Sequence, residues 1–435
     1  MSQQVNRRGF LGTASAVTAA ASLSAVAPSA FASARSQDNV LGANETIVIG
    51  IMGMNRGKEL APRFAKQPNV RIKYVCDVDE KRASEAAEAL AKANQQPQAI
   101  GELQQLLDDP EVHALVCAAP NHWHAPATIM ACNAGKHVYV EKPCSHNPAE
   151  GEWMVAAAEK NNRVVQMGAQ RRSGSNFHLA MQKLHEGIIG RVYHARNWYT
   201  NDRGSIGTED TSEPPPHINY ELWQGPAPRR PFKSNVVHYN WHWNWHWGNG
   251  ELGNNGVHTL DLCRWGLAAE LPIRVTSSGG RYHFSDDQQT PDTHTVCWEF
   301  PDDKQVTWEC MSCNRHKAGF VTFFGTKGTL DLDQDGTFRV YDKEDKQVSE
   351  EKSPGRGDDE HIANFFAAVR AGDASLLNAP ISEGHMSTLL CHLGNIAHRT
   401  GRTLNCNPAS GRILGDPQAM AHWQREYEPG WEPQV

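Results

Sequence analysis

Residues 45–57 read ETIVIGIMGMNRG, and this stretch decides the fold of the first part of the chain. Residues 45–51 are rich in β-branched side chains and end at glycines, which predicts a short buried strand. A helix is expected over 58–66, directly after the turn. A glycine-rich turn between a strand and a helix lets the backbone approach a pyrophosphate at the helix N-terminus. The sequence therefore predicts a dinucleotide site with these candidate cofactor-binding residues: Gly53, Asn55, Arg56 and Gly57.

Strands and helices then alternate as far as residue 167. Further strands are predicted at 70–76, 113–118, 136–140 and 163–167, and helices are predicted at 80–93, 125–134 and 149–160. Such alternation implies right-handed crossovers and a parallel sheet with helices on both faces. We therefore expect a doubly wound α/β domain of the Rossmann type over 45–165.

Asp77 closes the second predicted strand, 24 residues beyond Gly53. A carboxylate at about this spacing binds the ribose hydroxyls of a dinucleotide. It favours NAD, because it would repel the 2′-phosphate of NADP. Lys81 and Arg82 lie close behind it in the chain, so NADP stays open as an alternative.

Length and composition limit the classes of protein. The 435 residues are enough for two or three domains. A formal net charge of -7 provides no basic surface field, which argues against nucleic acid as a partner. No apolar run reaches the roughly 18 residues that a membrane helix needs. We expect no membrane span in the mature protein.

The first 34 residues have the order of an export signal. Arg7 and Arg8 precede a weakly apolar, alanine-rich stretch, and overlapping A-x-A sites end at Ala32 and Ala34. This order is typical of the twin-arginine pathway. The sequence predicts export through the twin-arginine machinery to the periplasm, with 1–34 removed.

The second half has a different pattern. Strands are predicted at 191–199, 274–277, 294–300, 305–310, 320–324, 328–332 and 338–341, and helices at 360–371 and 382–399. This pattern fits an α+β domain with a mixed, mostly antiparallel open sheet. We assign 166–407 to a substrate and oligomerisation domain and 408–435 to a C-terminal tail. Residues 200–231 form a long loop rich in Pro and Gly, and loops of that length are usually functional or mobile.

Residues 237–247 read VHYNWHWNWHW and hold four of the 13 tryptophans. In an extended strand the tryptophans would share one face and the histidines the other. The tract then fits either a carbohydrate-binding platform or a structural strand with a buried aromatic face. Metal binding by the histidines is disfavoured, because positions i and i+4 of a strand lie about 13 Å apart. Cys310 and Cys313 form a CxxC without a second pair, so we expect no metal site.

Three motifs together carry a family resemblance: GIMGMNRG at 50–57, AAPNHWH at 118–124 and EKP at 141–143. The chain resembles the Gfo/Idh/MocA sugar oxidoreductases from about residue 45 to 407. The resemblance implies that Lys142 lies beside the nicotinamide and assists proton transfer. It also implies a homo-oligomer, and cofactor contacts from Pro120, Asn121, His124, Glu141 and Lys142.

The family's D-x-G-x-H pattern falls on residues 254–258, where His258 matches the histidine that partners the lysine. The position of the aspartate is taken by Asn254, an amide that cannot ionise. If the segment is helical, Asp261 lies one turn beyond His258 on the same face. The candidate substrate-contacting residues are Arg171, Asn254, Asp261 and Trp243.

Together these features predict an exported NAD(P)-dependent oxidoreductase that transfers hydride from a sugar and holds its cofactor tightly. A second hypothesis is an NAD-dependent glycoside hydrolase or lyase that oxidises the sugar transiently and then eliminates the glycosidic bond. A third is a sugar-binding protein without turnover.

Overall fold

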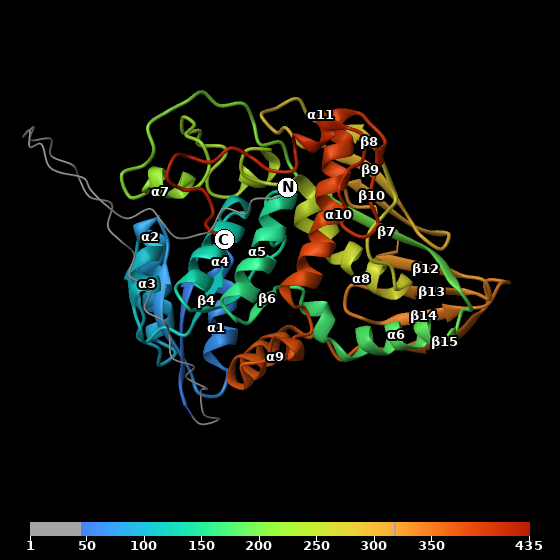
Figure 1. Cartoon of the computed structure of the whole chain (residues 1–435), viewed down its shortest axis with the longest axis horizontal. Helices are drawn as coiled ribbons and strands as arrows, with labels where there is room; N and C mark the ends of the chain where they lie inside the picture. The colour runs from blue at the N-terminus through green and yellow to red at the C-terminus, as the bar shows by residue number, and fades with distance from the viewer. Residues whose placement is uncertain (1–44, 317–318) are drawn as a thin grey trace, which may run out of the picture. The chain divides into compact units, whose positions relative to one another are not determined.

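The structure is a computed structural model that describes residues 45–316 and 319–435. The predicted export signal at 1–34 lies outside these residues. The described residues group into one compact unit by their contacts. Figure 1 shows that this unit holds two sheets, with long helices between and around them.

The first sheet has six parallel strands in the order β3-β2-β1-β4-β5-β6. This is the strand order of a dinucleotide-binding Rossmann fold. The sequence reasoning named neither β3 nor α3, because both are too short to show a period. The strands are β1 (Ile47–Met52), β2 (Val70–Cys76), β3 (Gln98–Ile100), β4 (Ala114–Cys117), β5 (His137–Val140) and β6 (Val165–Met167); the helices are α1 (Gly57–Ala65), α2 (Glu80–Ala91), α3 (Leu103–Asp108), α4 (Asn121–Asn133) and α5 (Pro148–Lys160).

One helix from the second half belongs to the packing of the first sheet. Helix α9 (Asp358–Ala371) buries Ile362, Phe365 and Phe366 in the same cluster as the strand residues of β1 and β2. The Phe365 ring meets Tyr139 of β5 edge-on at 5.9 Å. The predicted boundary at residue 165 therefore does not separate two independent cores, because a distant segment completes the first one.

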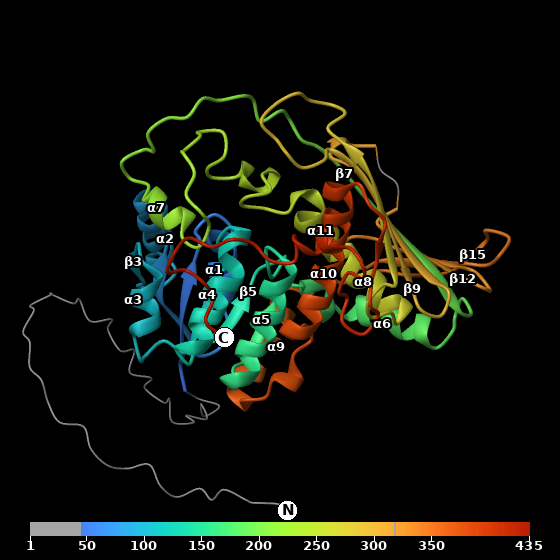
Figure 2. The ribbon, with the colours of Figure 1, turned by 45° about the horizontal axis from the view of Figure 1, so that its top comes forward.

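The second sheet is mixed and mostly antiparallel, as predicted. Its order is β15-β14-β13-β12-β7-β10-β9-β8-β16, and β7 runs parallel only to β10. Figure 2 shows α8 and α10 on the side of this sheet that faces the first one. The strands are β7 (Val192–Asp202), β8 (Arg274–Gly280), β9 (Thr293–Phe300), β10 (Lys304–Met311), β11 (Cys313–Asn314), β12 (Val321–Gly325), β13 (Thr329–Leu332), β14 (Phe338–Tyr341), β15 (Gln347–Glu351) and β16 (Leu404–Asn405); the helices are α6 (Ser175–His185), α7 (Tyr220–Gln224), α8 (Val257–Leu267), α10 (Ile381–Thr400) and α11 (Pro417–Met420).

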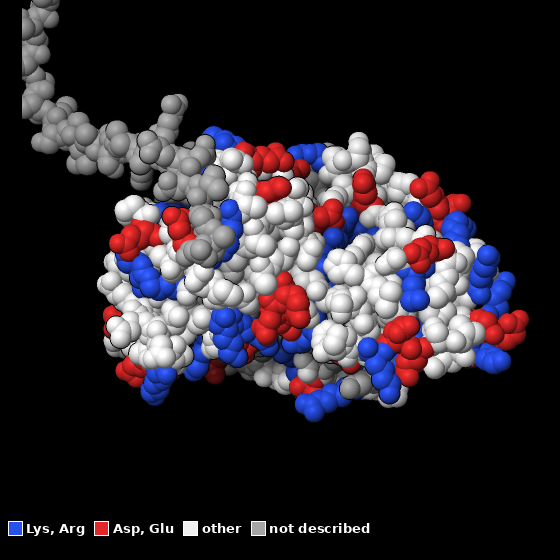
Figure 3. Space-filling model, turned by 90° about the horizontal axis from the view of Figure 1, so that it is seen from below, with Lys and Arg blue, Asp and Glu red and all other residues white. Residues whose placement is uncertain are grey.

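The surface carries charges of both signs. In the view of Figure 3, basic and acidic side chains are interspersed, and neither sign covers the face. Among the described residues, no helix has both the length and the apolar character that a membrane crossing requires.

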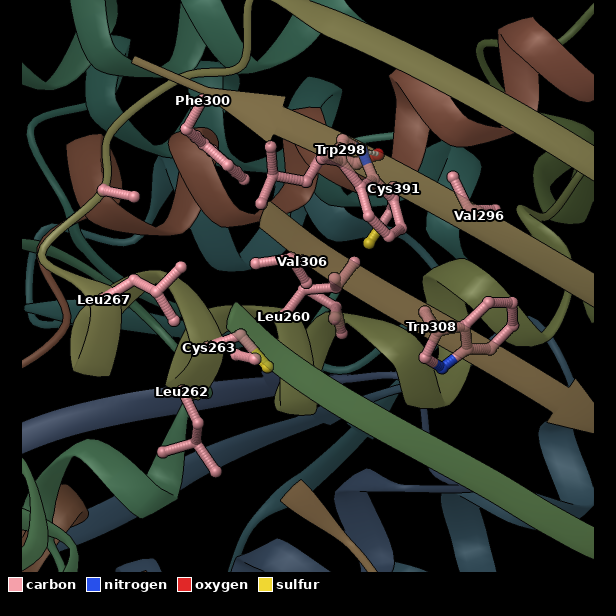
Figure 4. Close-up of a cluster of buried hydrophobic side chains, with 14 of the residues drawn as sticks. Leu260, Leu262, Cys263, Leu267, Val296, Trp298, Phe300, Val306, Trp308 and Cys391 are labelled. Atoms are coloured by element: carbon pink, nitrogen blue, oxygen red, sulfur yellow. Dashed lines mark hydrogen bonds between the residues drawn. The ribbon is translucent and has the colours of Figure 1, made fainter. Parts of the chain in front are cut away.

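The core of the second domain lies between its sheet and α8. Figure 4 shows Trp298 of β9 and Trp308 of β10 beside Leu260 and Cys263 of α8. Both indole rings are completely buried. Burial of an aromatic side chain removes 150–250 Å² from water in typical proteins. Two of the 13 tryptophans are therefore explained by this core alone. All ten cysteines are free thiols, and Cys310 and Cys313 lie on different strands.

The tryptophan tract is not a strand, so the predicted alternation of its two faces is wrong. Residues 234–247 form turns and a short 3-10 helix, Asn240–Trp243. Trp241, Trp243 and Trp247 are all buried. Trp241 and Trp247 form a satellite cluster with Trp223 from α7. The long loop therefore has a small apolar core of its own.

The C-terminal tail packs back onto the first domain. In Figures 1 and 2 the segment after α11 runs back toward α4. Arg425 Nη2 donates to the main-chain oxygen of His122 at 2.8 Å, and the Trp431 ring meets Trp123 edge-on at 5.2 Å. The segment predicted as a tail is thus part of the folded unit.

Candidate functional site

A cavity of about 540 Å³ opens at the carboxyl ends of the first sheet's strands. Ligands of open α/β sheets bind at this edge. Eleven of the fifteen predicted site residues line the cavity: Gly53, Asn55, Arg56, Asp77, Pro120, Asn121, His124, Glu141, Lys142, Asn254 and His258.

The turn after β1 fits a dinucleotide. Gly53 has a φ of +89°, and a Cβ there would lie 2.5 Å from the main-chain oxygen of Ala118. Only glycine tolerates both the conformation and the close approach. Gly57 does not line the cavity but begins α1, where a Cβ would press on Met54. Its role is therefore in packing the helix on the strand.

Asp77 closes one end of the cavity. Its carboxylate accepts hydrogen bonds from the main-chain N–H groups of Met54 at 2.6 Å and Asp79 at 2.9 Å. These bonds fix the carboxylate beside the Gly53 turn, where a ribose would lie. Arg82 lines the same end, and its Nε is 3.7 Å from Asp79. Burial raises the pKa of the Asp77 carboxyl above its ordinary value.

Lys142 follows β5 and reaches across to the second domain. Its Nζ donates to the main-chain oxygen of Asn254 at 2.6 Å and to the side-chain Oδ1 at 3.2 Å. The preceding Glu141 is buried and accepts a hydrogen bond from Gln170 at 3.3 Å. The peptide bond between Lys142 and Pro143 is cis.

The environment of Lys142 shifts its proton equilibrium. Burial lowers the pKa of its amine from 10.5 to about 8, because the charged form is poorly solvated. Glu141 opposes this shift and Arg56 adds to it. An amine with a pKa near 8 exchanges protons readily near neutral pH, as general acid–base catalysis needs.

His258 lies on the first turn of α8. Burial, with the positive charges of Arg171 and Lys142, holds the pKa of its imidazole well below the ordinary value. The ring is therefore neutral near pH 7. Asn254 lies in the π-helical turn Leu252–Gly256 that precedes α8, rather than in the helix itself. Asn254 and His258 still line the same cavity.

His124 and Asn121 shape the wall of the site. The two ring nitrogens of His124 lie 2.6 Å from the oxygen of Pro143 and 2.7 Å from that of Ala119. Asn121 Nδ2 donates to Asn249 Oδ1 at 2.9 Å. Both side chains hold neighbouring segments in place at the cavity wall, and their predicted contact with a cofactor stays a prediction.

Three candidate substrate residues lie outside the cavity lining. Asp261 is buried in an ion pair with Arg172 at 2.9 Å. The Arg171 guanidinium stacks 4.9 Å above the Phe320 ring. Trp243 is buried beneath Arg203. Asp261 does lie one turn beyond His258 on α8, as the spacing predicts. Its carboxylate is paired with the buried Arg172 instead of facing the cavity.

Sequence reasoning missed most of the roof of the cavity. Residues from the long loop, from the tryptophan tract and from the C-terminal segment cover the cofactor end. The tract itself was the only signal, since Tyr239, Trp241 and His242 all belong to it. The roof residues are Leu222, Trp223, His238, Tyr239, Trp241, His242 and Trp431.

The histidines of the tract are held separately. His238 Nε2 lies 3.0 Å from Asp79, His242 Nδ1 lies 2.5 Å from the oxygen of Tyr239, and His246 Nε2 lies 2.8 Å from that of Pro228. Burial lowers the pKa of His242 to about 3. Among residues 45–316 and 319–435, no three side chains of His, Cys, Asp or Glu are grouped to hold a metal ion.

Comparison with known proteins identifies the family. Residues 45–169 match the oxidoreductase family model with the NAD-binding Rossmann fold, and residues 193–432 match the model of the C-terminal α/β domain that accompanies it. The chain belongs to the Gfo/Idh/MocA oxidoreductase family. The resemblance inferred from the three sequence motifs is thus confirmed, and the second match includes most of the segment that was predicted as a tail.

Individual relatives of this Gfo/Idh/MocA protein are distant. A levoglucosan dehydrogenase of Pseudarthrobacter phenanthrenivorans is 27% identical over 218 residues, 48% of each chain. A glycosyl hydrolase family 109 protein of Saccharopolyspora erythraea is 32% identical over 166 residues, 37% of this chain and 36% of the relative. The alignments thus span half or less of these curated relatives.

Solved structures share the fold. An aldose-aldose oxidoreductase from Caulobacter crescentus, complexed with glycerol, has a TM-score of 0.66 at 17% identity and covers 83% of this chain and 100% of its own. A levoglucosan dehydrogenase complexed with NADH and levoglucosan has a TM-score of 0.65 at 18% identity, with coverage of 83% and 99%. At these identities the likeness concerns the fold alone.

Proposed function

We propose that the protein is an NAD-dependent oxidoreductase acting on a CH–OH group of a sugar or sugar derivative. The observation that carries the proposal is the bond from Lys142 Nζ to Asn254, which sets the amine at one cavity with His258 and the Gly53 turn. A bound nicotinamide would supply a hydride acceptor there. The named complex of the levoglucosan dehydrogenase supports the same class of substrate.

Different residues of the chain bind the cofactor, transfer the proton and exclude water. The Gly53 turn and Asp77 bind the dinucleotide at its pyrophosphate and ribose, and Asp77 favours NAD over NADP. Neutral Lys142 accepts the proton of the substrate hydroxyl, and neutral His258 is its partner in moving that proton. The loop and C-terminal residues of the roof exclude water from the cofactor end.

The pH dependence of oxidation follows from Lys142. Oxidation needs the unprotonated amine, so kcat/KM is expected to rise with pH and to level off above about 8.

The variant Asn254→Asp would place a carboxylate at the position of the amide that now accepts a hydrogen bond from Lys142 Nζ. A neighbouring negative charge raises an amine pKa by about 1 unit or more. The rising limb of the profile should move to higher pH by that amount; an unchanged profile would show that another group titrates.

Retention of the cofactor depends on the roof. Trp431→Ala removes an edge-on aromatic contact with Trp123, worth about 0.5–1.5 kcal/mol. We expect release of bound NADH to accelerate by about three- to tenfold, measured by the loss of its fluorescence on dilution. Trp431→Phe, which keeps an aromatic edge, should release NADH nearly as slowly as the unchanged protein. Equal release rates in all three proteins would contradict a covering role for the C-terminal segment.

A second candidate is an NAD-dependent glycoside hydrolase or lyase. The family 109 relative favours it, and the aromatic residues that roof the cofactor end suit a cofactor that is restored within each turnover. Transient oxidation of a sugar carbon acidifies the neighbouring C–H, which allows the glycosidic bond to be eliminated. The same Lys142 and His258 would then take the proton from the hydroxyl.

One experiment separates these activities. The purified protein is analysed by mass for bound dinucleotide and then tested against free sugars and aryl glycosides. Reduction of bound NAD by a free sugar supports the oxidoreductase. Glycoside cleavage without added NAD and without net reduction supports the hydrolase. Absence of bound dinucleotide, with no effect of added NAD on thermal stability, would contradict both and leave a sugar-binding protein.

We further propose export and self-association. Export rests on residues 1–34, and the test is the location of the protein after Arg7 and Arg8 are both changed to Lys.

Self-association rests on the outer face of the second sheet, where alternate residues of β9 and β10 stay partly exposed. Light scattering of the purified protein measures the number of subunits.

A further inference from the structure

A second cavity, of about 710 Å³, lies on the other side of the tryptophan tract. It shares no lining residue with the cavity at the Gly53 turn. Its walls come from the start of α5, the tract, the C-terminal half of α10 and the C-terminal segment. Its volume falls within the range of small-molecule sites. Nothing in the proposed oxidation uses it.

The lining of this cavity is strongly basic. Four arginines line it, Arg229, Arg230, Arg399 and Arg425, against a single acidic residue, Glu426. In the described part of the chain, neither Arg230 nor Arg399 has a carboxylate within 4 Å. The Arg399 guanidinium lies 5.2 Å above the Trp245 ring, and partial burial lowers its pKa. The Arg230 and Arg399 side chains are both exposed, and arginines without counter-charges at the mouth of a cavity are well suited to bind oxyanions.

The wall also contains buried donors without partners. Arg425 Nη2 lies 2.9 Å from Glu150 Oε1 and also donates to the main-chain oxygen of His122. The Nε and Nη1 atoms of Arg425 have no hydrogen-bond partner among the described residues. Asn147 is 95% buried, and its Nδ2 is likewise unpartnered in this part of the chain. Buried polar groups are nearly always hydrogen-bonded, so orphaned donors beside a cavity point to a missing acceptor.

We propose that this cavity binds an anionic sugar, a molecule of sugar size that carries a phosphate or carboxylate group. The guanidinium groups neutralise the anion, and the Asn147 and Arg425 donors supply the hydrogen bonds that the fold leaves unmade. The half-buried Trp245 ring provides an apolar surface for the body of the ligand. The site is separate from the catalytic cavity, so binding there does not depend on the proposed reaction.

Calorimetry on NADH-loaded protein tests the proposal, because NADH occupies the other anion-binding region. The probes are glucose 6-phosphate and glucuronate, with inorganic phosphate as the anion alone. We expect saturable binding of one or both sugars, which identifies the source of the anion. The double variant R230Q/R399Q should weaken binding by tenfold or more, since charged hydrogen bonds contribute about 1.5–3 kcal/mol each.

Arg191→Gln is the matched control, because Arg191 is an arginine outside this cavity whose Nη1 donates a long hydrogen bond of 3.5 Å to the main-chain oxygen of Asp302. It should bind the probes as the unchanged protein does. Equal melting temperatures and equal NADH binding in all three proteins show that the substitutions leave the fold intact. No saturable binding of any probe, or equal affinity in R230Q/R399Q, would overturn the proposal, the latter by placing the anion elsewhere.

Discussion

Replacing Lys142 with alanine is expected to lower the rate of sugar oxidation by about 10²- to 10⁴-fold, the usual contribution of a general acid–base group. The amine is held by Asn254 at the cavity wall, and no other amine among the described residues lines that cavity. Binding of NAD should change little, because the Gly53 turn and Asp77 remain. The rate is measured from the nicotinamide absorbance in a single turnover, and NAD affinity by calorimetry.

Lys142→Arg is the informative companion. It keeps a positive charge that can bond to Asn254, but a guanidinium does not release its proton in the accessible pH range. It should therefore be as slow as the alanine variant. A rate within a few fold of the unchanged protein for Lys142→Ala would show that proton transfer does not pass through this residue.

Asp261→Ala is expected to destabilise the protein by about 3–5 kcal/mol, because it leaves Arg172 buried without its main counter-charge. Among the described residues, the carboxylate that Arg172 then keeps is that of Glu383, at 3.1 Å. Ser387 also loses an acceptor, since its Oγ donates to Asp261 at 2.6 Å. Urea unfolding measures the loss in free energy of unfolding.

The same variant distinguishes a structural from a substrate-binding carboxylate. With Asp261 outside the cavity lining, KM of the folded fraction should stay within about twofold, whereas a carboxylate bound to substrate would raise KM strongly. The double variant R172M/D261L should recover much of the stability, because a buried ion pair is often replaced by apolar side chains at little cost. Stability equal to that of the unchanged protein in Asp261→Ala would contradict the role of the pair.

The first sheet was predictable because its signals are local. A β-branched run, a glycine turn and a helix repeat along 45–167, and each crossover has one allowed hand. Short elements such as β3 (Gln98–Ile100) carry too few residues to show a period. Helix α9 was predicted as a helix, but its place under the first sheet depends on contacts across hundreds of residues.

The proposed catalytic pair was named before the structure, but its surroundings were not predictable. The family resemblance names Lys142 and His258 as partners through the EKP motif at 141–143 and the D-x-G-x-H pattern at 254–258. That the amine of Lys142 bonds to Asn254, and that burial brings its pKa to about 8, follows only from the packing of two distant segments. Asp261 shows the converse, because its spacing was right and its partner unexpected.

The tryptophan excess shows where local reasoning ends. Alternation in VHYNWHWNWHW predicts two faces only if the chain is extended, and the sheet that would extend it is absent at this place. The sequence by itself indicated the dinucleotide-binding turn and the family, and it named the two proposed proton-transfer residues, since these depend on neighbours along the chain. Only the tertiary structure decided which aromatic rings roof the cofactor end and which arginines surround the second cavity, because burial and charge are set by segments that meet only when the chain folds.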